Sequence, residues 1–150
     1  MQQLIALFPQ PLGRYHIDAE PWQDLLRAQP MLRRDLHWYS QSNQVLRDLP
    51  ELKSLLQQHV DHFHQTIMGF RDPVEISISW LNENRKGDTT HQHQHPNSII
   101  SGCWYWDVIG TTEIHFHRQP TGSLGTYVVK LEQGVTEWNS DDTEIVVNQG

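Results

Sequence analysis

Residues 79–106 read SWLNENRKGDTTHQHQHPNSIISGCWYW, and the interpretation of the whole chain starts from this stretch. A polar loop, in which His91, His93 and His95 alternate with glutamines, leads through Pro96 into an apolar segment. Residues two apart in a strand point to the same face, so we expect His93 and His95 to present two imidazoles side by side. With a third ligand from another strand, such a pair forms a facial metal site. Spacing alone leaves open the alternative of a solvated loop.

The composition predicts one domain over residues 1–150, since a domain typically holds roughly 100–200 residues. The formal net charge of −7 opposes nucleic-acid binding through phosphate neutralisation. Cys103 is the single cysteine and excludes an intramolecular disulfide; we expect it to be a small core residue. The start MQQLIALFPQP has neither a basic segment nor a long apolar run. We therefore expect a cytoplasmic protein without a signal peptide or membrane span.

The first half of the chain, about residues 18–69, reads as helical. Asp18 can cap a short helix that runs to about Ala28. A longer helix is predicted with Asp48 as its N-cap, Pro50 in the first turn and Gly69 at its end. Its apolar residues follow the spacing of one buried face: Leu52, Leu55, Leu56, Val60, Phe63 and Ile67.

The second half, about residues 74–150, reads as a run of short strands. Residues 74–80 alternate between apolar and polar side chains, and residues 98–106 are apolar on both sides, as in a strand buried on both faces. Further strands are predicted over 112–117, 126–131 and 143–148. Helices followed by strands predict an α+β domain, with the helices packed outside a sandwich or barrel.

The central segment resembles the Fe(II)- and 2-oxoglutarate-dependent oxygenases, which are built on a double-stranded β-helix of the jelly-roll or cupin-like kind. In their prolyl-hydroxylase-like members, a ligand histidine lies six residues after a glycine turn and a second ligand follows two residues later. Gly87, His93 and His95 match that spacing. A narrower resemblance, covering nearly the whole chain, is to an oxygenase family of phages and bacteria. Its signature residues occur here in order: Trp80, Gly87, Asp88, His93, His95, Pro96, Asn97, Ser101, Gly102 and Tyr105. LFPQPLG and HWYSQSNQVL also look like that family.

The resemblance implies that His93 and His95 bind Fe(II), that 2-oxoglutarate is the cosubstrate beside Ser101 and Tyr105, and that an unidentified substrate is hydroxylated. Two departures stand against it. Most members carry a carboxylate where this chain has His95, and their distal histidine and cosubstrate arginine follow a segment that corresponds to the end at Gly150. A β-helix lacking those strands would expose an edge, so we expect pairing into a homodimer or an incomplete chain.

These departures keep a second class of function open. The alternative is a non-enzymatic, metal-binding cupin-like domain or a purely structural β-domain of phage origin, which would place it in the host cytoplasm. Arg85 and Lys86 are interpreted as part of a solvated turn, with steering of an anionic cosubstrate as the alternative.

The remaining histidines are weaker candidates for a metal site. His115 and His117 share the polar face of a predicted strand with Glu113. We interpret both as solvent-facing, and the alternative is that one of them supplies the third ligand. Three histidines of the long helix are predicted to be surface or boundary residues: His59, His62 and His64.

Overall fold

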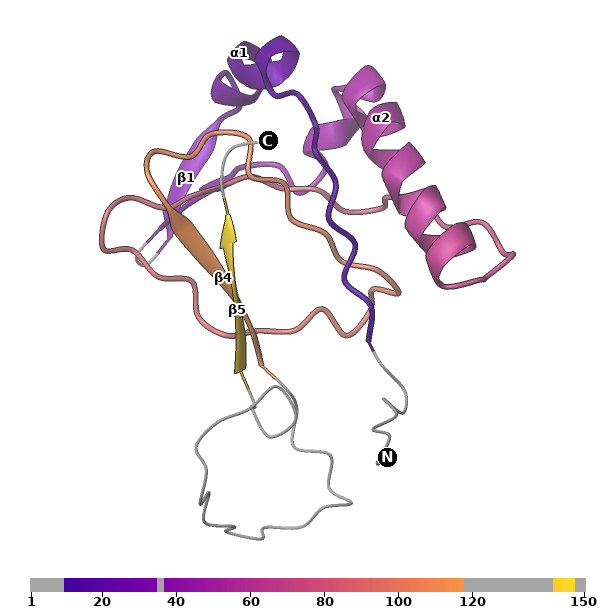
Figure 1. The fold of residues 1–150 in the computed structure, drawn as a ribbon. Coiled ribbons are helices and arrows are strands. Elements are labelled where there is room, and N and C mark those ends of the chain that lie inside the picture. The colour runs from indigo at the N-terminus through magenta and orange to yellow at the C-terminus, as the bar shows by residue number, and fades with distance from the viewer. Residues whose placement is uncertain (1–9, 35–36, 118–141, 148–150) are drawn as a thin grey trace, which may run out of the picture. The chain divides into compact units, whose positions relative to one another are not determined.

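The computed structural model describes residues 10–34, 37–117 and 142–147. Contacts between residues divide the chain into two compact units, Met1–Cys103 and Trp104–Gly150. All the described helices and a three-stranded sheet belong to the first unit, and a two-stranded sheet belongs to the second (Figure 1).

The first predicted helix is present as a short 3-10 turn, η1 (Glu20–Trp22), followed directly by α1 (Gln23–Arg27). The N-cap of η1 is Ala19 and not Asp18, although the backbone N–H of Glu20 donates to Asp18 Oδ1 at 3.0 Å, so Asp18 still satisfies one amide near the helix start. Leu26 points inward and is only 3% exposed. The prediction of a helix between residues 18 and 28 is confirmed.

The first unit also contains a three-stranded antiparallel sheet that the hydrophobic pattern does not predict. β1 (Met31–Arg34) pairs with β2 (His37–Ser40), and β2 pairs with β3 (Asn82–Glu83). The contact between β2 and β3 extends to Leu81, the residue before β3. The Ser40 N–H donates to the Leu81 carbonyl, and the Leu81 N–H donates to the Ser40 hydroxyl, both at 2.9 Å. These strands are too short to show a clear alternation of apolar and polar residues.

The long helix is confirmed in its first part. A 3-10 turn, η2 (Val45–Arg47), leads into α2 (Pro50–Asp61), with Pro50 at the first helical position and Leu49, instead of Asp48, as the N-cap. Leu52 is completely buried. The buried apolar core of the described chain lies within the first unit and consists of Ile17, Ala19, Leu26, Val45, Leu46, Leu49 and Leu52.

The end of the long helix departs from the predicted face. After α2 the chain forms a π-helix, η3 (His62–Ile67), in which the Met68 N–H donates to the Phe63 carbonyl at 3.0 Å. A π-turn holds one more residue than an α-turn, so it rotates the side chains that follow. His64 is therefore buried, at 4% exposure, while Ile67 is 51% exposed. The predictions of a surface or boundary His64 and of a buried Ile67 are both wrong for this reason.

Residues ahead of α1 pack along the long helix. The Tyr15 hydroxyl is hydrogen-bonded to His62 Nδ1 at 2.8 Å, and its ring centroid lies 4.8 Å from that of His59. Gly13 approaches so closely that an added Cβ would lie 2.7 Å from Phe63 Cδ2. His59 is half-buried and His62 is exposed, so the boundary and surface positions predicted for these two histidines are confirmed.

The predicted strand over residues 74–80 does not form. The segment carries only an isolated parallel bridge, between Gln44 and Ser79. Its backbone instead pairs with a helix side chain, since Gln57 Nε2 donates to the Val74 carbonyl at 2.9 Å and Gln57 Oε1 accepts from the Ile76 N–H at 3.0 Å. A side chain of α2 thus satisfies groups that a neighbouring strand would otherwise pair with.

The predicted buried strand over residues 98–106 is also not formed. The Ser98 N–H closes a turn by donating to the His95 carbonyl at 3.1 Å, and Ile99 is 78% exposed. An apolar run forms a strand only where a partner strand accepts its hydrogen bonds. The strand predicted over 126–131 lies outside the described residues. Cys103 is exposed, which corrects its interpretation as a core residue.

The second unit contains β4 (Thr112–His117) and β5 (Asp142–Val147), which form an antiparallel pair. Figure 1 shows β4 in orange and β5 in yellow, side by side. The strand predicted over 112–117 is therefore confirmed, as is the one predicted over 143–148 for its described residues 143–147. Ile114 lies opposite Ile145, and both are half-buried, while Phe116 is 41% exposed.

The α+β class is confirmed by helices combined with small antiparallel sheets. The described strands form sheets of three and two strands and do not confirm a double-stranded β-helix. Among the described helices, none has both the length and the apolar character of a membrane span.

Candidate functional site

The three alternating histidines lie in an exposed loop of the first unit, between β3 and the unit boundary. The loop follows a tight turn in which the Arg85 N–H donates to Asp88 Oδ2 at 2.8 Å and the Asp88 N–H donates to the Arg85 carbonyl at the same distance. Gly87 has a φ of 92°, in the left-handed region that favours glycine. The glycine turn that precedes the histidines in the sequence pattern is thus present.

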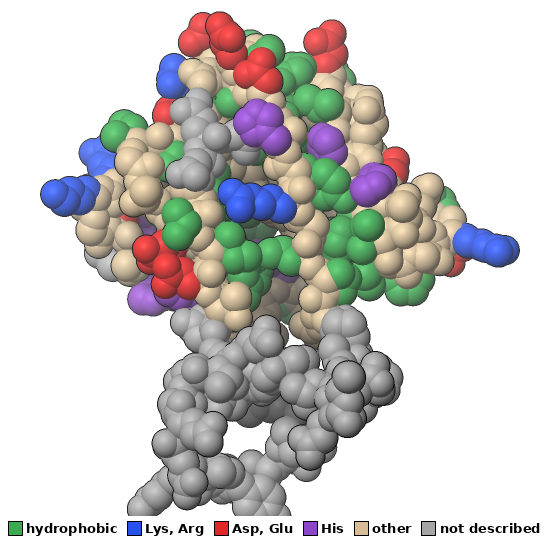
Figure 2. All heavy atoms as spheres, viewed as in Figure 1, with side chains coloured by type: hydrophobic (Ala, Val, Ile, Leu, Met, Phe, Trp, Pro, Cys, Tyr) green, Lys and Arg blue, Asp and Glu red, His purple; other side chains and the backbone are tan. Residues whose placement is uncertain are grey.

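The structure brings His93 and His95 together. Their ring centroids lie 4.8 Å apart and the ring planes are nearly perpendicular, at 86°. The Trp80 ring lies 5.4 Å from the His95 ring and borders the pair on one side. Both imidazoles are exposed, and Figure 2 shows histidine side chains at the surface on the face in view. A pair of neighbouring, accessible imidazoles can share one metal ion.

A backbone contact sets the tautomer of His93. Its Nδ1 lies 2.8 Å from the His91 carbonyl oxygen, which can only accept a hydrogen bond. Nδ1 therefore carries the proton, and the lone pair of the neutral ring is on Nε2. Metal-binding histidines commonly donate their other ring N–H to a carbonyl or carboxylate in this way. The contribution of His91 to the pair is its backbone carbonyl, which accepts the hydrogen bond from His93.

The two residues expected beside the cosubstrate belong to different units of the chain. Ser101 is exposed and belongs to the first unit, whereas Tyr105 is half-buried and belongs to the second. Neither lies on a regular strand, because residues 98–106 do not form one. Their assignment to 2-oxoglutarate stays a prediction from the resemblance.

Arg85 makes contacts near the glycine turn. Its Nε lies 3.0 Å from a carboxylate oxygen of Glu83, and its guanidinium lies 5.3 Å from the centroid of the Trp38 ring. An ion pair and an aromatic contact hold the side chain over the three-stranded sheet. These contacts favour a structural role over steering of an anionic cosubstrate.

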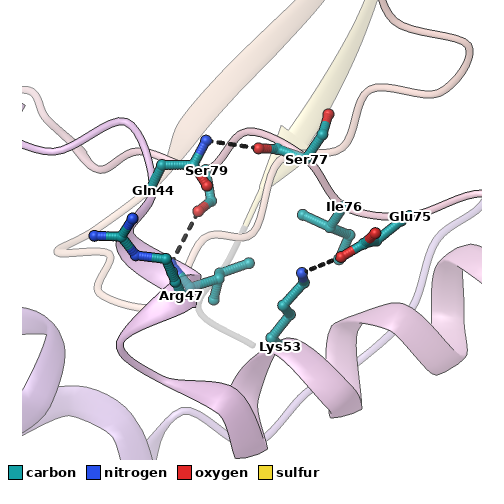
Figure 3. Close-up of a pocket in the computed structure, with 8 residues that line it drawn as sticks. Gln44, Arg47, Lys53, Glu75, Ile76, Ser77 and Ser79 are labelled. Atoms are coloured by element: carbon teal, nitrogen blue, oxygen red, sulfur yellow. Dashed lines mark hydrogen bonds and ion pairs between the residues drawn. The ribbon is translucent and has the colours of Figure 1, made fainter.

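A polar cavity of about 350 Å³ lies in the first unit between η2, α2 and residues 75–79 (Figure 3). Gln44 Nε2 donates to the Ser77 carbonyl at 2.8 Å, and Lys53 Nζ lies 2.6 Å from Glu75 Oε1. This hydrogen bond and the positive charge of Lys53 lower the pKa of the Glu75 carboxyl below its ordinary value. Because these polar groups already pair with one another, we interpret the cavity as a feature of the packing between η2, α2 and residues 75–79, and not as a binding site.

Two histidines, His37 and His64, are buried, although the sequence pattern does not predict their burial. His64 Nε2 donates to the Asp72 carbonyl at 2.7 Å, and His37 Nε2 is hydrogen-bonded to the Tyr39 hydroxyl. Their Nδ1 atoms are buried without a hydrogen-bond partner among the described residues. The π-turn explains the burial of His64, and no simple periodicity signals it.

A second group of metal-ligating side chains lies on the sheet of the second unit. Glu113, His115 and Glu144 each offer one ligand atom within 4.8 Å of the others. His117 follows along β4, with its ring 6.3 Å from that of His115 and nearly parallel to it. All four side chains are exposed, which confirms the solvent-facing positions predicted for the two histidines.

No family model, curated protein or solved structure matches this chain.

Proposed function

We propose that this protein is an oxygenase of the Fe(II)- and 2-oxoglutarate-dependent type, with His93 and His95 as two of its metal ligands. The observation that carries the proposal is the adjacency of the two imidazoles, whose ring centroids are 4.8 Å apart. The order of the signature residues from Trp80 to Tyr105 supports the assignment to this class.

The donor set fits a divalent transition ion. Imidazole nitrogen suits Fe(II), Zn(II) and related metals, and the hydrogen bond from His93 Nδ1 to the His91 carbonyl leaves Nε2 available for coordination. Two imidazoles are a partial site, and the family pattern adds a distal histidine as the third ligand. When bound, Fe(II) and 2-oxoglutarate supply the oxidative hydroxylation of a C–H bond.

The chain's own contribution to such a site is to hold the two rings in place. The turn at Gly87 sets the direction of the loop, and the bond between the His95 carbonyl and the Ser98 N–H closes the loop after the second ring. Trp80 lies against the His95 ring and limits its rotation on that side. A double-stranded β-helix that carries the pair belongs to the same proposal.

Anaerobic titration with Fe(II), followed by 2-oxoglutarate, tests this function. We expect the wild-type protein to bind Fe(II) and to develop a visible charge-transfer band with 2-oxoglutarate. His93→Ala and His95→Ala should each weaken metal binding by about tenfold or more. His91→Ala is the matched control, because it removes an imidazole from the same loop but keeps the carbonyl bonded to His93. Equal binding by all four proteins would refute the assignment of the ligands.

Metal binding without turnover is the second candidate function, and the exposure of the site favours it. Both imidazoles lie open to water, whereas oxygenase chemistry requires a site that excludes water. An imidazole at position 95 in place of a carboxylate also makes the site more positive by one charge. Bound Fe(II) without the charge-transfer band, and without succinate formation from 2-oxoglutarate, would favour this cupin-like alternative.

A further inference from the structure

The sheet of the second unit places three ligand-type side chains on one face. His115 and Glu144 are direct partners in the register of β4 and β5, so their side chains point to the same side of the sheet. Glu113 lies two residues before His115 on the same strand and shares that side. The backbone ladder therefore fixes the three positions from two different strands.

The distances between the three side chains allow them to share one metal ion. His115 Nε2 lies 3.6 Å from Glu113 Oε2, close enough for an ion pair when the imidazole is protonated and longer than a good hydrogen bond. One ligand atom from each of the three residues lies within 4.8 Å of the other two. Ligands at about 2.0–2.2 Å from one ion lie at most about 4.4 Å apart, so small side-chain rotations would complete the coordination.

The two carboxylates on this face also favour binding of a cation. Glu113 and Glu144 bring two carboxylates close together, and the sequences of β4 and β5, TEIHFH and DTEIVV, contain neither lysine nor arginine. Like charges at this separation repel each other. A divalent ion between the three side chains would remove this repulsion.

We propose that Glu113, His115 and Glu144 form a second metal site, for a divalent transition ion such as Zn(II). The imidazole favours a transition ion over Ca(II) or Mg(II), which prefer oxygen ligands alone. The three side chains are exposed, so water can fill the remaining coordination positions. All three side chains belong to the second unit, whereas His93 and His95 belong to the first.

Zn(II) titration of the full chain carrying His93→Ala and His95→Ala tests this site separately from the proposed oxygenase. We expect this background protein to bind one equivalent of Zn(II) by calorimetry. Adding Glu144→Gln or His115→Gln should raise the Kd by about tenfold or more. Glu51→Gln removes an exposed carboxylate in α2 and is the matched control, with an unchanged Kd.

Two results would overturn the proposal: a background protein that binds no Zn(II), or variants whose Kd equals that of the control. If either variant fails to fold, as judged by circular dichroism without metal, the background protein decides the question. Nitrogen NMR of its imidazoles should then show a shift of the His115 resonance when Zn(II) is added. An unchanged His115 resonance at saturating Zn(II) would refute the site.

Discussion

Replacing Gln57 with alanine should loosen the segment that was expected to be a strand. The Gln57 side chain accepts from the Ile76 N–H at 3.0 Å and donates to the Val74 carbonyl at 2.9 Å. A third contact, from Gln57 Nε2 to Asp61 at 2.8 Å, orients the amide along the helix. With the side chain gone, both of these bonds from α2 to the segment are lost.

The expected loss follows from the two bonds to the backbone. A net contribution of about 0.5–1.5 kcal/mol for each bond gives a loss of about 1–3 kcal/mol. Since about 1.4 kcal/mol corresponds to a factor of ten, a loss of about 2 kcal/mol should accelerate hydrogen exchange at the Ile76 amide by roughly 30-fold, within a range of about 5- to 150-fold. Urea denaturation followed by circular dichroism measures any effect on the global free energy of unfolding.

Gln58→Ala supplies the control for this experiment. Gln58 is the next residue of α2 and is exposed, so its replacement gives the same small gain in helix propensity without breaking a bond to residues 74–76. The difference between Gln57→Ala and Gln58→Ala then isolates the contacts of the Gln57 side chain, and exchange at the Ile76 amide reports on its bonds to the backbone. If both variants protect the Ile76 amide as well as the wild type does, the helix side chain does not hold the segment and the reasoning is wrong.

Three further predictions concern the first unit. Leu52→Ala should lower the free energy of unfolding by about 2–5 kcal/mol in urea denaturation, because the side chain is fully buried in the core. Gly13→Ala places a Cβ 2.7 Å from the nearest aromatic ring carbon and should destabilise the protein by about 1–3 kcal/mol, whereas Gly102→Ala meets nothing within 4 Å and should be neutral. Lys53→Met should raise the pKa of Glu75 toward its ordinary value, as measured by NMR titration. Because the ion pair lowers that pKa in the folded state, its stabilisation is present above the ordinary carboxyl pKa and is lost as the pH falls through the lowered value, so the variant should lose this acid-range dependence.

The sequence predicts the elements that depend on local signals. The spacing of the apolar residues and Pro50 locate α2, and alternation locates β4 and β5. It misplaces residues 74–80, because alternation reports half-burial and says nothing about which group supplies the hydrogen bonds. Here the side chain of Gln57 in α2 supplies them. A contact between residues 57 and 76 leaves no trace in a local sequence pattern.

In the candidate sites, too, local spacing predicts some contacts, and others depend on the tertiary structure. Proximity of His93 and His95 follows from their spacing of two residues and needs no tertiary information. The joining of Glu113 and His115 with Glu144 depends on the register of two strands that are far apart in the sequence, so spacing could indicate only the half on β4. Burial of His64 depends on a change of helix type that side-chain periodicity does not encode.

The π-helical end of the long helix has a consequence for insertions and deletions. Because the wide turn accommodates one residue more than an α-turn, deleting a single residue within 62–67 would restore α-spacing and turn the rest of the chain by about 100° about the helix axis. Residues 70–76 would then leave the helix in another direction, away from the side chain of Gln57 that now meets them. Chain length in this short stretch is therefore under as strict a structural constraint as residue identity is in the core.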